Sequence, residues 1–243
     1  MLVRLIFSSY LLVMTFGCAS SSNSKSDSGS TSSPLLRHVV LLKFKDDATP
    51  MQMKAIEEAF RALPSQIPEI VDFEWGRDVS IEGKHQDFTH CFLVSFADDV
   101  GRNVYLPHPA HKAFVDLLLP ILDKATVIDF YGQDIQGTSN VNGQLRHVVL
   151  FDFKEETSDE ALRAIESKFA SLPGDISEIT AFEWGTNNSP EGLNNGHTHV
   201  FLITFQDETS REVYLPHPAH KEFGRTVRGH VEKVLVFDYW AKE

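Results

Sequence analysis

The feature that most constrains this chain is an exact internal repetition. The octapeptide Tyr-Leu-Pro-His-Pro-Ala-His-Lys occupies residues 105–112 and returns unchanged at residues 214–221, an offset of 214 − 105 = 109 positions. The same offset relates the Phe-Glu-Trp-Gly motifs at 73–76 and 182–185. Because the offset never changes, the two copies align without a gap. A duplicated unit of about 95 residues explains the pattern, since a solenoid needs shorter and more numerous repeats.

Each copy has the sequence pattern of a small α+β unit. Alternating apolar residues predict strands, and apolar residues at helical spacing predict helices. Thr49 and Pro50 are typical of a helix start, and Pro107 predicts a break within the second helical region. In the first copy we expect strands at 36–45, 70–79, 88–96 and 124–131, helices at 50–63, 98–106 and 108–122, and a loop at 80–87.

This order, βαββαβ, predicts a ferredoxin-like fold with helices on one face of each sheet. The other face needs cover, and the second copy in the same chain can provide it. The predicted fold class is therefore α+β, with two tandem ferredoxin-like units pairing into an α/β barrel. The predicted domains are residues 36–131 and 145–240, joined by a linker of Gly, Ser, Thr and Asn at 132–144.

The N-terminal segment indicates export. Arg4 precedes an apolar stretch that ends at Gly17-Cys18, which is typical of a bacterial lipoprotein signal over residues 1–18. Lipidation of Cys18 would anchor the protein in a membrane, facing the periplasm or the cell exterior. An ordinary signal cleaved near Ala19 and an uncleaved anchor are the alternatives. Residues 19–35 are rich in Ser and predict a disordered tether.

Charge and cysteine content exclude several function classes. The formal net charge is −12, so the overall field repels a phosphate backbone and disfavours nucleic-acid binding. The only cysteine outside the signal segment is Cys91, which we expect to be a buried free thiol. The sequence contains no P-loop, dinucleotide fingerprint or nucleophile elbow, so we expect no nucleotide cofactor.

Histidine and tyrosine side chains recur at equivalent positions of the two copies. His38 and His90 lie on apolar faces of their predicted strands, and His111 lies on the apolar stripe of its predicted helix. Tyr105 ends the preceding helix, and His108 stands before Pro109 at a position typical of an N-cap. The equivalent residues of the second copy are Tyr214, His147, His199, His217 and His220.

The ordered motifs resemble the stress-responsive dimeric α/β-barrel domain family. They comprise Arg-His-Val-Val-Leu, Phe-Glu-Trp-Gly, the Thr-His strand, the octapeptide and the closing Val-Ile-Asp-Phe or Val-Phe-Asp-Tyr. The resemblance covers residues 36–131 and 145–240 and implies a ferredoxin-like unit whose sheet pairs with a second sheet. The wider superfamily includes cofactor-free monooxygenases and haem-handling proteins, so the family implies fold better than function.

The resemblance to a plant polyketide cyclase of this family suggests which residues do chemistry. Its catalytic Tyr and His match Tyr105 and His111, and equally Tyr214 and His220, while its other pocket histidines match His38 and His90, and His147 and His199. A neutral imidazole can remove a proton next to a carbonyl, and a tyrosine hydroxyl can stabilise the oxyanion.

Purely structural roles for these side chains are the alternative to catalysis. A metal site is a third interpretation of the two octapeptide histidines, but no Glu accompanies them as in a zinc protease motif, and we expect no metal. Two function hypotheses follow. One is a pocket for a hydrophobic small molecule, with cofactor-independent acid–base chemistry on a carbonyl compound; the other is a non-catalytic envelope stress, structural or binding protein.

Overall fold

The computed structural model describes residues 34–137 and 141–243. The predicted signal segment, Cys18 and the tether as far as residue 33 lie outside the described residues. In the part of the chain that is described, no helix is both long and apolar enough to cross a membrane.

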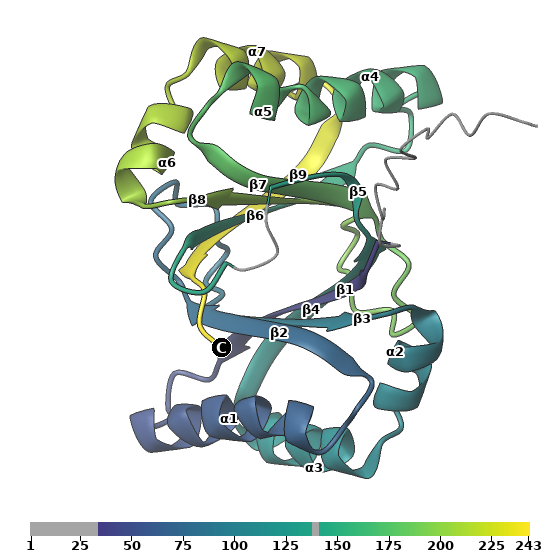
Figure 1. The fold of residues 1–243 in the computed structure, drawn as a ribbon, viewed down its shortest axis with the longest axis vertical. Helices are drawn as coiled ribbons and strands as arrows, with labels where there is room; N and C mark the ends of the chain where they lie inside the picture. Colours follow the sequence, from purple (N-terminus) through teal and green to yellow (C-terminus); the bar gives the residue numbers. More distant parts are fainter. Residues whose placement is uncertain (1–33, 138–140) are drawn as a thin grey trace, which may run out of the picture. The chain divides into compact units, whose positions relative to one another are not determined.

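The first copy folds as one four-stranded antiparallel sheet with its helices packed on one face (Figure 1). The sheet order is β2-β3-β1-β4, as in a ferredoxin-like unit. Its elements in chain order are β1 (Leu36–Phe44), α1 (Pro50–Ala62), the 3₁₀ turn η1 (Leu63–Ser65), β2 (Ile70–Arg77), β3 (His90–Phe96), α2 (Asp99–Tyr105), α3 (Pro109–Leu118), the 3₁₀ turn η2 (Leu119–Ile121) and β4 (Leu122–Tyr131).

The second copy repeats this topology and adds a strand. Its sheet order is β5-β7-β8-β6-β9. The elements are β5 (Gln133–Gly137), β6 (Leu145–Phe153), α4 (Asp159–Ala170), α5 (Leu172–Asp175), β7 (Ile179–Thr186), β8 (His199–Phe205), α6 (Glu208–Tyr214), α7 (Pro218–Val227) and β9 (Val231–Trp240). Strand β5 lies in the segment 132–144 that we expected to be a linker, and it forms because its backbone pairs with the edge strand β7.

The helix starts follow from local sequence. Thr49 caps α1 with its hydroxyl oxygen, which accepts from the backbone N–H of Gln52, and Gln52 reaches back to the Thr49 backbone. The side chain of His108 accepts from the backbone N–H of Ala110 and caps α3, while Pro109 takes the first helical position. The octapeptide therefore fixes a helix–break–helix corner in each copy.

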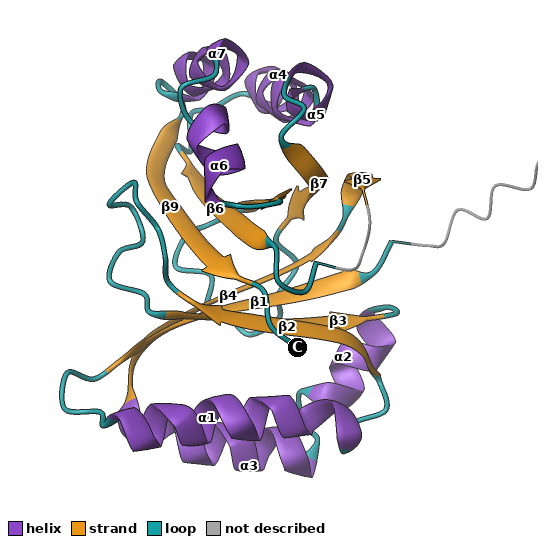
Figure 2. Ribbon diagram, turned by 60° about the vertical axis from the view of Figure 1, so that its left-hand side comes forward, coloured by secondary structure: helices purple, strands orange, loops and turns teal. Residues whose placement is uncertain are grey.

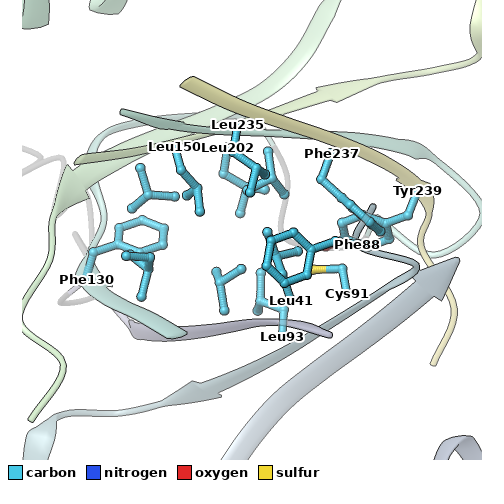
Figure 3. Packing of buried hydrophobic residues seen from close by; sticks show 14 of the residues in the cluster. Leu41, Phe88, Cys91, Leu93, Phe130, Leu150, Leu202, Leu235, Phe237 and Tyr239 are labelled. Carbon is cyan, nitrogen blue, oxygen red and sulfur yellow. The ribbon is translucent and has the colours of Figure 1, made fainter. Parts of the chain in front are cut away.

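The two sheets face each other across a shared apolar core. Figure 3 shows Leu41, Cys91 and Leu93 of the first copy against Leu150 and Phe237 of the second. Cys91 is fully buried there as a free thiol, as expected. The opposite face of each sheet packs against its own helices in a separate core (Figure 2). Each repeat thus covers the sheet face that the other leaves bare.

Each copy extends past its last strand to pair with the other. Gln133, just after β4, pairs with Trp184 of β7, and the equivalent Lys242, just after β9, pairs with Trp75 of β2. The glycine of each Phe-Glu-Trp-Gly motif lies at these seams. A Cβ atom on Gly76 would lie 2.6 Å from the carbonyl oxygen of Trp240. The motif therefore uses glycine because two backbones of different repeats meet there.

Substitution of Gly76 tests this explanation. We expect Gly76→Ala to lower the free energy of unfolding by roughly 1–3 kcal/mol, because the new methyl group overlaps Tyr239 and Trp240. Gly174→Ala is the matched control, since a Cβ atom there meets no heavy atom within 4 Å. Urea unfolding of both variants measures the difference. Equal stability of the two variants would contradict the close approach of the Gly76 backbone to Tyr239 and Trp240.

Candidate active site

The octapeptide places a tyrosine and a histidine side by side. Tyr105 ends α2, the chain turns at Pro107, and His111 in the first turns of α3 faces back toward it, with ring centroids 4.2 Å apart. The Nδ1 atom of His111 lies 3.0 Å from the carbonyl oxygen of Leu106. A carbonyl oxygen only accepts, so Nδ1–H donates and the neutral ring keeps its lone pair on Nε2.

The second copy reproduces this arrangement. The ring centroids of Tyr214 and His220 are 4.2 Å apart, and the Nδ1 atom of His220 lies 3.0 Å from the carbonyl oxygen of Leu215. The side chain of His217 caps α7 as His108 caps α3. The two copies of the octapeptide thus form the same local structure.

The two tyrosine hydroxyls are available to a ligand. Neither Tyr105 nor Tyr214 makes a side-chain hydrogen bond within residues 34–137 and 141–243, and each lines a cavity. Burial raises the pKa of both phenols well above the usual range. Each hydroxyl therefore stays protonated at neutral pH and can act as a hydrogen-bond donor rather than as a base.

The paired histidines are suited to accept protons. Burial lowers the pKa of His111 and of His220, and it outweighs the opposing effect of the hydrogen bonds to the Leu106 and Leu215 carbonyls. Both imidazoles are consequently neutral at neutral pH. The lone pair on each Nε2 atom makes the ring a candidate general base.

A third group joins Tyr105 from strand β1. The Nδ1 atom of His38 lies 2.6 Å from the Oδ1 atom of Asp129, whose Oδ2 atom lies 3.0 Å from an Nη1 atom of Arg102. The rings of His38 and Tyr105 meet edge to face at 5.7 Å. Burial by itself lowers the pKa of His38, but the buried Asp129 carboxylate outweighs it and raises the pKa overall.

The second repeat contains the equivalent triad. The Nδ1 atom of His147 lies 2.6 Å from Oδ1 of Asp238, and Nη1 of Arg211 lies 2.6 Å from Oδ2 of the same carboxylate. Sequence reasoning missed the carboxylates and arginines of both triads. Their signal was present, because Asp129 and Asp238, like Arg102 and Arg211, are separated by the repeat offset.

These side chains line one cavity in each repeat, between the sheet and α3 or α7. The first cavity, of about 140 Å³, contains His38, Tyr105 and His111 on a wall of aliphatic and aromatic residues. The second, of about 300 Å³, contains the equivalent His147, Tyr214 and His220. Both therefore combine an apolar lining with a few polar groups, as ligand sites commonly do.

Each cavity is completed by the other repeat. Glu191, from the loop after β7, lines the first cavity and lies 3.9 Å from the His38 imidazole. Glu82 and Lys84, from the loop after β2, line the second cavity. Burial raises the pKa of Glu191. The sequence gives no local hint of this exchange, because the loops reach the cavities only when the two sheets face each other.

The structure does not bring His90 and His199 into these groups. The Nε2 atom of His90 lies 3.2 Å from Glu57 of α1, and that of His199 lies 3.2 Å from Glu166 of α4. Neither histidine lines the cavity that holds the Tyr–His pair. They are the first residues of β3 and β8, where His90 pairs with Leu42 and His199 with Phe151, each four residues along the strand from His38 or His147. This separation explains why a shared apolar face did not place them in a shared pocket.

No three His, Cys, Asp or Glu side chains gather as metal ligands in the described segments. The octapeptide histidines instead have separate partners, with His108 on the α3 backbone and His111 on Leu106.

Comparison with known proteins gives the same assignment for both repeats. The model of the family called the stress responsive A/B barrel domain matches residues 36–131 and 145–241. A stress-response A/B barrel domain-containing protein of Arabidopsis thaliana is 39% identical over 97 residues, which cover 40% of this chain and 89% of that protein. Olivetolic acid cyclase of Cannabis sativa is 32% identical over 95 residues, covering 39% of this chain and 94% of the cyclase.

Longer matches cover both repeats together. Another stress-response A/B barrel domain-containing protein of Arabidopsis thaliana is 26% identical over 220 residues, covering 87% of this chain and 81% of that protein. The crystal structure of a candidate monooxygenase of Fusobacterium nucleatum has a TM-score of 0.62 at 13% identity, covering 87% of this chain and 94% of that one, and it shows the shared fold alone. This chain belongs to the stress-responsive A/B barrel domain family, of which it carries two tandem copies.

Proposed function

We propose that each cavity is a site of cofactor-independent acid–base chemistry on a carbonyl compound with a hydrophobic body. The observation that carries the proposal is the Tyr–His pair. In both repeats, a phenol without a protein partner among the described residues and an imidazole whose Nδ1–H is held by a carbonyl border the same apolar cavity.

The roles follow from the protonation states. The Nε2 lone pair of His111 takes a proton from the carbon next to the carbonyl, and the electrons of that C–H bond move to the carbonyl oxygen. The Tyr105 hydroxyl donates a hydrogen bond to the resulting enolate oxygen. His38, in its protonated form, donates from Nε2 as a second stabilising group. In ketonisation of an enol the steps run from the other side: His111 takes the enol O–H proton, the same two donors stabilise the enolate, and His111 delivers that proton to the carbon, which regenerates the neutral imidazole.

The relatives support this chemistry without defining a substrate. The name of olivetolic acid cyclase describes an enzyme that forms a ring. Ring closure through a carbon next to a carbonyl begins with the same proton removal. The apolar walls around Val40, Phe92 and Leu118 in the first cavity suit a hydrocarbon group beside the reacting carbonyl.

Ketonisation of the enol of hexanoylacetone tests the proposal, because the reaction moves a proton between oxygen and carbon and changes the ultraviolet absorbance. We expect saturable acceleration by the wild-type protein. We expect the Tyr105→Phe, Tyr214→Phe double variant to lose about 10²-fold of it, since an oxyanion donor has an effect of this order. Tyr131→Phe is the matched control, because the Tyr131 phenol binds Asp99 and lines neither cavity.

Two results would reject the catalytic role. Hexanoylacetone could bind without any acceleration, which would leave a non-catalytic binding protein. Alternatively, the double variant and Tyr131→Phe could retain equal activity, which would remove the tyrosines from the chemistry.

The acid limb of the pH profile should lie lower than for an ordinary histidine. The neutral imidazole is the active form, and burial lowers the pKa of His111 and His220, so protonation stops catalysis only below about pH 6.5. We therefore expect kcat/KM for ketonisation to stay constant as the pH falls from neutral to about 6.5, and to decrease only at lower pH. A limb centred above it would show that another group controls the reaction.

We also propose that the protein is exported and lipid-anchored at Cys18. The support is the order of Arg4, an apolar stretch, Gly17-Cys18 and a Ser-rich segment. In a bacterial host fed labelled palmitate, the protein should incorporate label and sediment with membranes, and Cys18→Ser should abolish both. Release of an unlabelled protein processed after residue 18 would instead indicate an ordinary secretory signal.

A further inference from the structure

The two cavities share their catalytic pairs but differ in shape. Val115 on α3 narrows the first cavity, and Gly224 takes the equivalent place on α7 in the second. A Cβ atom on Gly224 would meet no heavy atom within 4 Å, so open space lies where the valine side chain would be. The volumes, about 140 and about 300 Å³, follow this difference. The second reaches the range, roughly 300–1,000 Å³, of small-molecule sites.

The rims differ in charge as well as in size. Leu119 lines the first cavity and is 55% exposed, whereas the equivalent residue of the second cavity is Arg228. Leu193 lines the first cavity where Lys84 lines the second. Two apolar positions of one site are thus cationic in the other.

A second hollow adjoins the larger cavity. It measures about 390 Å³ and shares His220, Gly224 and Arg228 with that cavity, so the two meet beside the glycine. Lys221 and Arg225 line the rest of its wall on α7. A ligand with its body in the cavity can therefore reach this hollow past His220.

Two of these cations have no carboxylate partner. Lys84 binds Glu82 at 2.8 Å, and Arg225 binds Glu222. Lys221 and Arg228 form no ion pair within the described residues. The chain has a formal net charge of −12, so its overall field repels anions. Unpaired cations beside a cavity can offset that repulsion locally.

We propose that the cavity of the second repeat binds an amphiphilic anion, with its hydrocarbon chain in the cavity and its carboxylate or phosphate group on Lys221 and Arg228. The inference deepens the proposed function by naming the ligand class of one of its two sites. The first cavity, with the lone Glu191 carboxylate and the apolar Leu119 at its rim, takes neutral compounds instead.

Calorimetric titration of the full chain with octanoate, octyl phosphate and octanol tests the assignment. We expect one anion per chain, bound more tightly than octanol, with an affinity that falls as sodium chloride is added because salt screens exposed charges. A preference for octanoate or for octyl phosphate identifies the head group.

Substitutions in the lining of the second cavity and the adjoining hollow locate the site. Arg228→Leu, which introduces the residue of the first repeat, combined with Lys221→Leu should weaken octanoate binding by about tenfold, since exposed charges contribute modestly. Gly224→Val should abolish binding of the chain by filling the cavity, and the open space there lets the variant fold. Arg163→Leu is the control for Arg228→Leu alone, because it removes one positive charge from an exposed position on α4, and it should leave the affinity unchanged.

Three results would overturn the inference: equal affinity for octanol and octanoate, two equivalent anion sites per chain, or an Arg163→Leu effect as large as that of Arg228→Leu. The proposed function fails independently of these. Anion binding without ketonisation of hexanoylacetone would reject the catalytic proposal and leave the anion site standing. Ketonisation without a preference for anions would reject the anion site and leave the catalytic proposal standing.

Discussion

Replacing both candidate bases, His111→Gln with His220→Gln, is expected to lower kcat/KM for enol ketonisation by about 10²- to 10⁴-fold, the usual contribution of a general base. Glutamine is neutral and similar in length, and it can still hydrogen-bond to the Leu106 and Leu215 carbonyls. It offers no basic nitrogen to the cavity. Steady-state rates with hexanoylacetone measure the loss.

The octapeptide supplies its own control. His108→Gln with His217→Gln alters histidines only three residues away, whose side chains cap α3 and α7. These variants should lose about 0.5–2 kcal/mol of stability per cap while keeping the rate constants. If both histidine pairs affect rate and stability alike, the histidines of the octapeptide serve the fold alone.

Single variants separate the two sites. The single variant His111→Gln should retain the turnover of the second cavity, and the single variant His220→Gln should retain the turnover of the first. The sum of the two residual rates should approach the wild-type rate, because the ring of each candidate base lines only its own cavity. Complete loss in either single variant would mean that only one cavity works.

The largest effect on stability is expected for Arg146→Met, at about 3–5 kcal/mol, because it leaves a buried carboxylate without its cation. Arg146 of the second repeat donates from Nε to Oε1 of Glu74 in the first repeat at 2.8 Å, and both residues are buried. The Tyr239 hydroxyl also binds this carboxylate, and Thr204 binds the arginine. The pair ties the two sheets together.

A double-mutant cycle tests the ion pair itself. Arg146→Met with Glu74→Met should recover most of the loss, since replacing a whole buried pair by apolar groups is often nearly neutral. Urea denaturation supplies the free energies. The equivalent Arg37–Glu183 pair, at 3.1 Å, is more exposed on its arginine side, so Arg37→Met should cost less. A double variant as unstable as Arg146→Met would assign the effect to packing.

Much of the fold could be predicted from local sequence. Alternation of apolar residues located the strands, and Thr49, Pro50, Pro107 and His108 marked helix starts and the break, because capping and proline geometry act within a few residues. Strand β5 was missed. Its backbone is paired with β7, so the strand forms through that pairing and its own residues did not have to show an alternating apolar pattern.

The candidate site was partly predictable for the same reason. Tyr105 and His111 lie within one octapeptide, and a short turn suffices to bring them together. The expectation for His90 followed from the strand pattern, which gives the face of a side chain and not its position along the sheet. The pairing of that histidine with Glu57 of α1 depends on how the helix crosses the sheet.

By itself, the sequence determined the duplication, the ferredoxin-like unit and the two Tyr–His corners, because propensity, capping and periodicity are encoded in neighbouring residues. Only the tertiary structure decided which other side chains surround each Tyr–His pair. The exchange of Glu82 and Glu191 between repeats, the support of His38 by Asp129, and the cationic rim of the second cavity all join residues far apart in the chain. Burial then raises the pKa of Glu191 and lowers the pKa of His111 and His220, which a sequence pattern cannot show.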